Sequence, residues 1–416
     1  MDRRELESLV AADPAAMRVT ERLEFDRLSG GREIVLMGAG GLGRRALAGL
    51  RRHGVEPLAF ADNGRPGTVL DGVRVLSPEA AAREFGGRAV FVVTIWGANR
   101  PHRFAHSREQ LRALGCDVVS SFPPLFWKYP DALLPFYLQD LPSRLLGQRA
   151  DVLGAFDLWE DEASRAEYVA QVRFRVNADF DGLSPPVTHP QYFADDLFGW
   201  SADEWIVDGG AYDGDTLRTL SRLHGDRFGH ILALEPDPAN FAKLQAAAAE
   251  LPPAARAKVD CRQVAVGSER TTLYLDATGT AASATAVAPS AGTIAVRADT
   301  IDALVDRAAP TFIKLDIEGF EPDALEGARQ TIQRHAPVLA VCVYHRQDHL
   351  WSIPLLLRQW RDDYALFLRP HNEEGWDLVC YAVPRARLSD LRKRWSARPL
   401  PPGVRGRRSG DAGHGL

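Results

Sequence analysis

The stretch Ile206-Val-Asp-Gly-Gly-Ala-Tyr-Asp-Gly-Asp-Thr216 decides the fold of the larger half of this chain. A short apolar run leads into an acidic residue, then a glycine-rich turn, then a segment with helical character. A strand–turn–helix unit of this kind is typical of an open α/β sheet, in which ligands bind at the carboxyl ends of the strands. Glycines in the turn let the backbone approach a bulky ligand closely. The alternative is a tight turn that binds nothing.

The charge of the turn indicates the kind of ligand. Asp208 and Asp213 are acidic, and like charges disfavour a phosphate group beside them. An acidic turn suits a ligand with a cationic amino group and a sulfonium. S-adenosylmethionine (SAM) carries both groups.

A further acidic residue ends the next predicted strand, residues 230–234, where Glu235 precedes Pro236. A carboxylate at this position can accept hydrogen bonds from a ribose diol, as in dinucleotide-binding folds. The alternative is a residue that only opens the helix predicted over 238–250.

The third informative stretch is Phe312-Ile-Lys-Leu-Asp-Ile-Glu-Gly-Phe-Glu321. A strand is predicted over 312–316, and the alternation of Lys314, Asp316 and Glu318 places them on one face or toward one end. Three ionisable groups cannot be buried together without partners. They therefore form a structural ion network or line a site.

Together these stretches resemble the FkbM family of SAM-dependent methyltransferases. The resemblance covers residues 191–383 and rests on VDGGAYDGDT, LEPDPANFAKL, RADTIDAL and IKLDIEGFEPDALEGA, in this order. It implies a class I methyltransferase domain, a seven-stranded Rossmann-like sheet whose last strand is antiparallel. It also implies SAM as cofactor and methylation of a hydroxyl on a sugar, glycolipid or natural product.

The resemblance assigns the cofactor site residue by residue. Asp316 matches the acid that ends the fourth strand beside the transferred methyl group, and Ala265 sits where class I enzymes contact adenine. The residues expected to bind the cofactor are Asp208, Gly209, Gly210, Ala211, Tyr212, Asp213, Thr216, Glu235, Pro236, Ala265 and Asp316.

Two segments, 189–196 and 344–351, are expected over the carboxyl edge of this sheet, where the acceptor binds. The expected substrate-binding residues are Tyr192, Phe193 and Tyr344.

The expected catalytic set is His345, Asp316, Glu318 and Lys314. His345 is the candidate general base, because an imidazole with a pKa of about 6.5 can accept a hydroxyl proton. Asp316 or Glu318 is the competing base, and the alternative for His345 is a hydrogen bond within its own loop. With His349 these groups could hold a divalent metal, but their spacing matches no recognised ligand pattern, so no metal is expected.

A second glycine-rich turn, Gly38-Ala-Gly-Gly-Leu-Gly43, follows a predicted strand at 33–37 and opens a helix predicted over 44–53. This context fits a dinucleotide fingerprint, with the diphosphate on the helix N-terminus. The expected second nucleotide site comprises Gly38, Gly40, Gly43 and Asp62.

Residues 32–120 also resemble the small Rossmann-like domain of PglD-type sugar acetyltransferases. This implies a module that binds a nucleotide-linked sugar. A structural domain with an empty loop and a domain for NAD-dependent hydride transfer are the alternatives.

The chain of 416 residues is long enough for two domains. The expected parts are a smaller Rossmann-like α/β domain (1–125), a helical bridge with a helix over 151–176 (126–200), the methyltransferase domain (201–384) and a basic, partly disordered tail (385–416). Further strands are predicted over residues 57–61, 89–95, 117–120, 259–264, 338–344, 364–368 and 377–383.

Composition excludes several classes of protein. The net charge of −5 argues against a broad basic face for nucleic acid. The sequence contains no run of about 18 apolar residues, so no membrane span is predicted. The acidic N-terminus does not resemble a secretory signal. Four cysteines without CxxC spacing favour reduced thiols in a cytoplasmic protein. The expected partner is a small-molecule or glycan acceptor, and a homodimer is left open.

Two other functions are left open by the sequence. An NAD-dependent oxidoreductase would use residues 38–43 and bind NADH. A non-catalytic nucleotide-binding scaffold would bind SAM without turning it over.

Overall fold

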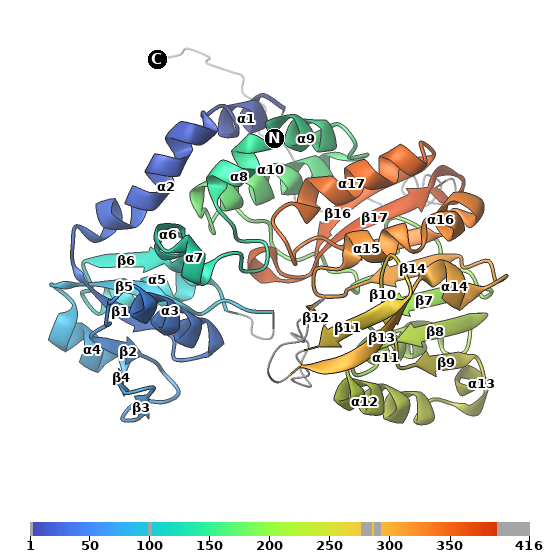
Figure 1. The fold of residues 1–416 in the computed structure, drawn as a ribbon, viewed down its shortest axis with the longest axis horizontal. Helices are drawn as coiled ribbons and strands as arrows, with labels where there is room; N and C mark the ends of the chain where they lie inside the picture. The colour runs from blue at the N-terminus through green and yellow to red at the C-terminus, as the bar shows by residue number, and fades with distance from the viewer. Residues whose placement is uncertain (1–2, 99–101, 276–284, 287–292, 389–416) are drawn as a thin grey trace, which may run out of the picture.

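The computed structural model describes residues 3–98, 102–275, 285–286 and 293–388. Two α/β units stand on either side of a layer of helices (Figure 1). Each unit is built on a mainly parallel sheet, so the predicted fold class is confirmed.

The first sheet has six strands in the order β3-β4-β2-β1-β5-β6, parallel except for the β3–β4 hairpin. The strands are β1 (Glu33–Met37), β2 (Ala59–Ala61), β3 (Val69–Leu70), β4 (Val73–Leu76), β5 (Ala89–Val93) and β6 (Val118–Ser121). The helices are α3 (Gly41–Arg52), α4 (Pro78–Phe85) and α5 (Phe104–Ala113). In this order β2 lies on one side of β1 and β5 lies on the other. The direction in which successive strands are added therefore reverses between β1 and β5, which is where ligands bind in open α/β sheets.

The layer of helices contains the bridge and also the N-terminal helices, which pack on it. Its helices are α1 (Arg3–Leu9), α2 (Pro14–Ser29), α6 (Phe122–Lys128), α7 (Pro130–Leu133), α8 (Pro142–Gly147), α9 (Arg149–Phe156) and α10 (Glu162–Asn177). The single helix predicted over 151–176 is wrong. Asp161 starts a new helix there by accepting the Ser164 N–H at 2.8 Å, and α9 and α10 are separate.

The second sheet has seven strands in the order β16-β17-β15-β14-β7-β8-β9, and β17 is antiparallel to both of its neighbours. This is the arrangement expected for a class I methyltransferase. The strands are β7 (Trp205–Gly209), β8 (His230–Leu234), β9 (Val259–Arg262), β14 (Phe312–Leu315), β15 (Val338–Cys342), β16 (Tyr364–Pro370) and β17 (Leu378–Pro384).

The helices of this unit follow its strands in alternation. They are α11 (Asp215–His224), α12 (Pro238–Ala249), α13 (Pro253–Arg256), α14 (Ile301–Val305), α15 (Glu321–Glu326), α16 (Arg329–His335), α17 (His349–Trp360) and the 3₁₀ turn η1 (Glu373–Gly375).

A small four-stranded sheet beside the second one was not predicted. Its order is β10-β13-β11-β12, with β10 (Ala265–Val266), β11 (Thr271–Leu275), β12 (Thr285–Ala286) and β13 (Ile294–Asp299). Leu273, Leu275, Val296 and Ala298 form a separate apolar cluster under it. Its strands are short, and one pairing joins β10 to β13 across a long stretch of sequence, so local patterning does not reveal it.

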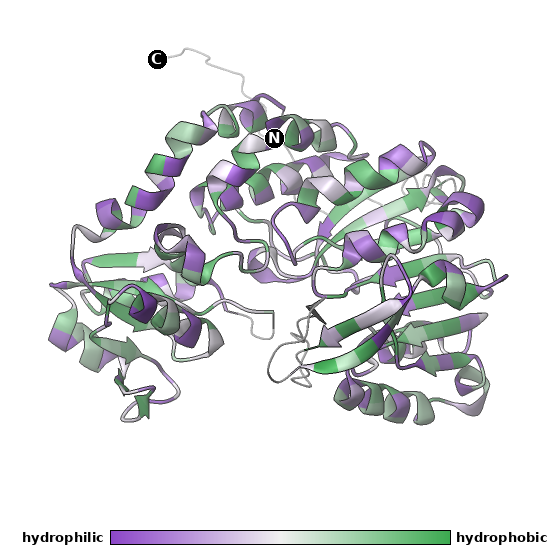
Figure 2. Ribbon diagram, in the orientation of Figure 1, coloured by the Kyte–Doolittle hydropathy of each residue, from purple (hydrophilic) through white to green (hydrophobic). Residues whose placement is uncertain are grey.

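One continuous apolar core runs through both large sheets and the helices between them. Figure 2 shows that their strands are predominantly hydrophobic, whereas the helices alternate hydrophobic and hydrophilic residues. In the described part of the chain, no helix is both long and apolar enough to span a membrane. All four cysteines are free thiols. The expected C-terminal tail lies outside the described residues from position 389 onward.

Candidate active site

The glycine loop after β7 packs against the end of β14. Gly210 has φ 79°, and a Cβ atom there would lie 1.9 Å from the carbonyl oxygen of Asp316. The N–H groups of Gly210 and Ala211 both donate to Leu234 O at 3.0 Å. Only glycine fits at position 210, so the loop is fixed at the carboxyl edge of three neighbouring strands.

Glu235 holds the same loop from the end of β8. Its carboxylate accepts the N–H of Tyr212 at 2.8 Å and the N–H of Asp237 at 2.9 Å. Burial raises the pKa of Glu235 to about 6, against these two hydrogen bonds. The carboxylate is therefore ionised at neutral pH, beside the loop, with lone pairs left for further donors.

Asp208 and Lys314 form a buried ion pair across β7 and β14. Lys314 Nζ lies 3.0 Å from Asp208 Oδ1 and donates to Gly210 O at 2.5 Å. Both side chains are 2% exposed, and the ring of Tyr192 lies 5.2 Å from the ammonium. Burial opposes the charge of Lys314, but the Asp208 carboxylate raises the pKa of Lys314 above its usual range. These contacts argue against a direct catalytic role for Lys314, because Asp208 and the carbonyl group of Gly210 hold its ammonium beneath the glycine loop.

Asp316 and Glu318 come just after β14, which ends at Leu315, so the expected alternation along the strand is not formed. Asp316 accepts hydrogen bonds from the hydroxyls of Tyr192, at 2.7 Å, and Tyr344, at 3.3 Å. Glu318 has φ 55°, and burial raises its pKa to about 7 against the opposing charge of His345. Two carboxylates with different surroundings, one of them bound by two tyrosine hydroxyls, thus share the carboxyl end of β14.

His345 lies among three carboxylates. Its Nδ1 is 2.8 Å from Glu321 Oε1, and its Nε2 is 3.3 Å from Asp316 Oδ1 and 3.9 Å from Glu318 Oε2. Burial alone would lower the pKa of His345, but Glu321, Glu318 and Asp316 together raise it to about 10. The three carboxylates therefore favour the protonated imidazole, which argues against the expected role of His345 as general base.

Residues 208–365 match the family model of the methyltransferase FkbM domain. This matched segment, called the FkbM domain here, contains the glycine loop and the strands β8, β9, β14 and β15. The sequence resemblance pointed to the same family.

Among solved structures, the chain is similar to methyltransferase FkbM from Methylobacillus flagellatus KT. The two are 23% identical with a TM-score of 0.72, over 91% of this chain and 97% of the other, so they share their fold. Two further matches have TM-scores too low to carry an argument. One is a fibrillarin pre-rRNA processing protein of Methanococcus jannaschii, with 12% identity and a TM-score of 0.27 over 44% of this chain and 67% of the other. The second is a putative sugar binding protein of Salmonella typhimurium LT2, with 16% identity and a TM-score of 0.16 over 64% of this chain and 85% of the other. A search of curated proteins finds no match.

Four further residues were expected to bind the cofactor, and two of them, Asp213 and Ala265, contact other parts of the protein. Asp213 pairs with Arg218 at 2.6 Å on the outer side of the loop. The side chain of Ala265 packs into the apolar cluster of the small sheet. Thr216 is in the first turn of α11, directly after the loop, and Pro236 follows Glu235.

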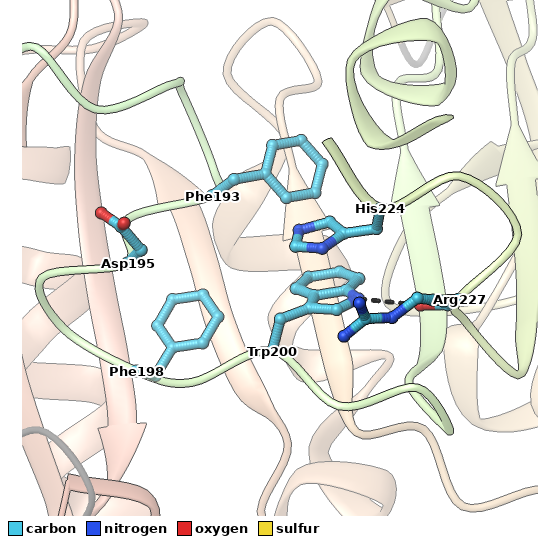
Figure 3. A pocket seen from close by; sticks show the side chains of 6 residues that line it. All are labelled: Phe193, Asp195, Phe198, Trp200, His224 and Arg227. Atoms are coloured by element: carbon cyan, nitrogen blue, oxygen red, sulfur yellow. Dashed lines mark hydrogen bonds between the residues drawn. The ribbon is translucent and has the colours of Figure 1, made fainter. Parts of the chain in front are cut away.

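Phe193 does not face the FkbM carboxylates. It lines a pocket of about 250 Å³ with Asp195, Phe198, Trp200, His224 and Arg227 (Figure 3). His224 ends α11, a helix of ten residues that starts at the glycine loop, so the pocket lies roughly 15 Å from that loop. Phe193 is therefore separated from the carboxylates, whereas the hydroxyls of Tyr192 and Tyr344 donate to Asp316.

Sequence reasoning missed four residues around the carboxylates: Tyr137, Glu321, Trp376 and Asp377. Burial and the neighbouring Asp316 raise the pKa of Asp377 to about 6. Tyr137, Trp376 and Asp377 lie outside the matched segment. Their proximity depends on tertiary packing, which leaves no local signal. The described residues contain no group of His, Cys, Asp and Glu side chains arranged to hold a metal ion.

In the first domain, the glycine loop after β1 is explained by its own packing. A Cβ on Gly38 would lie 2.6 Å from Ile95 Cγ1, and one on Gly43 would lie 2.0 Å from Gly38 O. Asp62 accepts the N–H groups of Ala39 and Gly64, each at 2.8 Å. Gly40 caps α3 and has open space around it. No contact here favours an oxidoreductase, and the similarity to PglD-type acetyltransferases stays a prediction.

Proposed function

We propose that the chain is a SAM-dependent methyltransferase that methylates a hydroxyl oxygen of a small-molecule or glycan acceptor. The match to the methyltransferase FkbM domain supports the class of reaction. When bound, SAM supplies an electrophilic methyl group on a sulfonium sulfur.

The residues of the glycine loop fit this cofactor. Glu235 presents an ionised carboxylate that can accept ribose hydroxyls, and the absence of a side chain at Gly210 keeps the loop close to β14. Asp316, beyond the end of β14, adds negative charge on the side where a sulfonium would lie. Asp208 contributes indirectly, since its carboxylate holds Lys314.

The carboxylate of Glu318 is the feature that best supports O-methylation. A hydroxyl acceptor must lose a proton as it takes the methyl group, and a base works best when its pKa lies near the working pH. Burial raises the pKa of Glu318 to about 7. Asp316 already accepts two tyrosine hydroxyls, which favours Glu318 as the group that takes the proton.

Calorimetry with S-adenosylhomocysteine (SAH), the demethylated product, tests the cofactor site. Wild-type protein should bind SAH, and Glu235→Gln should weaken binding at least about tenfold, because two ribose hydroxyls lose a charged acceptor. Glu250→Gln, at an exposed glutamate beyond α12, is the matched control and should bind like wild type. Wild-type protein that does not bind SAH would refute the proposal.

Transfer of tritium from [methyl-³H]SAM to hydroxyl and amine acceptors tests the chemistry. Label is expected on hydroxyl compounds, and it should depend on Glu318. Label on amines alone would refute O-methylation and leave the cofactor assignment standing.

A further inference from the structure

A tight turn from the helical bridge reaches the catalytic carboxylates of the FkbM domain. Phe136 N–H donates to Gln139 O at 2.9 Å, and Gln139 N–H donates to Phe136 O at 3.0 Å. Tyr137 is the first central residue of this turn and has φ 50°. An aromatic residue in the left-handed region is uncommon and costs free energy, and such strain is concentrated at functional sites.

The side chain of Tyr137 lies near the carboxylates that follow β14. Its ring centroid is 4.7 Å from that of Trp376 and 6.4 Å from that of His345. Burial, together with the charges of Glu318 and Asp316, raises the pKa of Tyr137. Its hydroxyl makes no hydrogen bond to the described residues, in contrast to the hydroxyls of Tyr192 and Tyr344.

The first domain holds this turn in place through α3. Arg45 donates from Nε and Nη2 to Leu133 O, at 3.2 and 3.0 Å, and from Nη2 to Pro135 O at 3.3 Å. Its guanidinium also lies 5.0 Å from the Phe136 ring. A Cβ on Gly49 would meet Leu133 Cδ2 at 2.3 Å, so α3 and α7 are in close contact (Figure 1).

The other side of Tyr137 is also backed by the first domain. Trp376, in the β16–β17 connection, packs on Trp96, which follows β5, with ring centroids 4.5 Å apart and ring planes tilted by 47°. The Trp96 indole N–H donates to Glu374 O at 3.1 Å. Trp376 is 7% exposed, and its indole N–H has no hydrogen-bond partner among the described residues. Tyr137 and Trp376 thus form an aromatic wall beside Glu318, and residues before the FkbM domain support both.

We propose that the first domain closes the acceptor side of the methyl-transfer site through Tyr137, which limits the size of the group that fits in front of the transferred methyl. Tyr137 is a specificity-determining residue in this view, and Arg45 is the residue that positions it. The inference rests on the proposed function, since it requires SAM beside Glu235 and Asp316.

An analogue of SAM that carries a benzyl group in place of the methyl probes this space without any acceptor. Its affinity, measured by calorimetry, should rise at least about tenfold in Tyr137→Ala relative to wild type, equivalent to about 1.4 kcal/mol. Tyr137→Phe, which keeps the ring, should resemble wild type, and Arg45→Ala should show a smaller gain. Tyr129→Ala is the matched control, because Tyr129 belongs to the same bridge but packs on His53 of the first domain.

SAH affinity in the same proteins distinguishes a failure of the Tyr137 inference from a failure of the proposed function. It should stay within about threefold of wild type in every variant. A gain of affinity for the benzyl analogue cannot arise from a damaged fold, so it would report the wall itself. Equal analogue affinity in wild type and Tyr137→Ala, with SAH still bound, would overturn the inference alone. Failure of wild type to bind SAH would instead refute the proposed function.

Discussion

The Nδ1 atom of His345 lies 2.8 Å from Oε1 of Glu321, and both side chains are at most 1% exposed. Glu321 also accepts the N–H of Ile317 at 2.9 Å, and its Oε2 lies 3.2 Å from His349 Nδ1. One carboxylate therefore balances the charge of His345 and fixes the loop that presents Glu318. Although burial opposes it, the two histidines hold the pKa of Glu321 well below its usual range.

The variant Glu321→Gln should change the protonation state of His345. The Glu321 carboxylate contributes most to the raised pKa of His345, so its loss should lower this pKa from about 10 toward the ordinary value of about 6.5. ¹⁵N NMR of histidine-labelled protein at pH 8 should show a doubly protonated ring in wild type and a neutral ring in the variant. Glu326→Gln, at an exposed residue of the same helix, should leave the spectrum unchanged. A neutral His345 in wild type at pH 8 would contradict this prediction.

The same pair should make stability depend on alkaline pH. A histidine whose pKa is raised in the folded state contributes stability fully below its unfolded pKa of about 6.5 and loses it as pH rises through the folded value of about 10. Urea unfolding at pH 7, 8.5 and 10 should therefore show a difference in free energy of unfolding between wild type and Glu321→Gln that shrinks as pH rises. Lysines and tyrosines titrate in both proteins, so they cancel in the difference. A difference that is constant across this range would show that His345 is not the cation.

Asp208 and Lys314 should be coupled in stability. Asp208→Ala leaves a buried ammonium without its partner, which should cost about 3–5 kcal/mol. Lys314→Met in the Asp208→Ala background should restore part of this loss, because it removes the stranded charge. Urea unfolding of the wild type, both single variants and the double variant gives the coupling energy. Additive losses would mean that the 3.0 Å contact contributes nothing.

The strands of the second sheet could be predicted from the sequence because the signals for them are local. The stretch 206–216 combines a buried strand, glycines with positive φ and a helix start, and the strand expected over 230–234 matches β8. The resemblance then supplied the number of strands and the antiparallel last strand, β17. Asp316 and Glu318 were predicted as site residues from their alternation with Lys314 at the end of an apolar strand.

The roles within the site could not be read in this way. Whether Lys314 and His345 face a ligand or a carboxylate depends on residues distant in sequence, such as Asp208 for the first and Glu321 for the second. Tyr137 is more remote still, because its position depends on Arg45 of the first domain. Sequence periodicity reports which side of a strand is buried, but not which charged partner meets it there.

Glu318→Gln should abolish most methyl transfer to a hydroxyl acceptor. Loss of the base should lower kcat roughly 10²–10⁴-fold, while SAH affinity stays near wild type because the cofactor contacts are elsewhere. In wild type, kcat should increase as pH rises through about 7, since Glu318 accepts a proton only when it is ionised. The assay is tritium transfer from [methyl-³H]SAM, with Glu326→Gln as control. A kcat that is equal at pH 5.5 and pH 8 would exclude Glu318 as the base.

Gly210→Ala should eliminate SAH binding, whereas Gly40→Ala should not affect it. Position 210 has φ 79°, and an added Cβ would lie 1.9 Å from Asp316 O, which is backbone and cannot yield without moving β14 away from the loop. Gly40 caps α3 in the glycine loop of the first domain, with φ −86° and nothing within 4 Å of an added Cβ. Calorimetry with SAH and thermal unfolding would separate lost binding from lost folding. If Gly210→Ala binds SAH like wild type, the ligand does not depend on the close approach of this loop to β14, and the cofactor site must lie elsewhere.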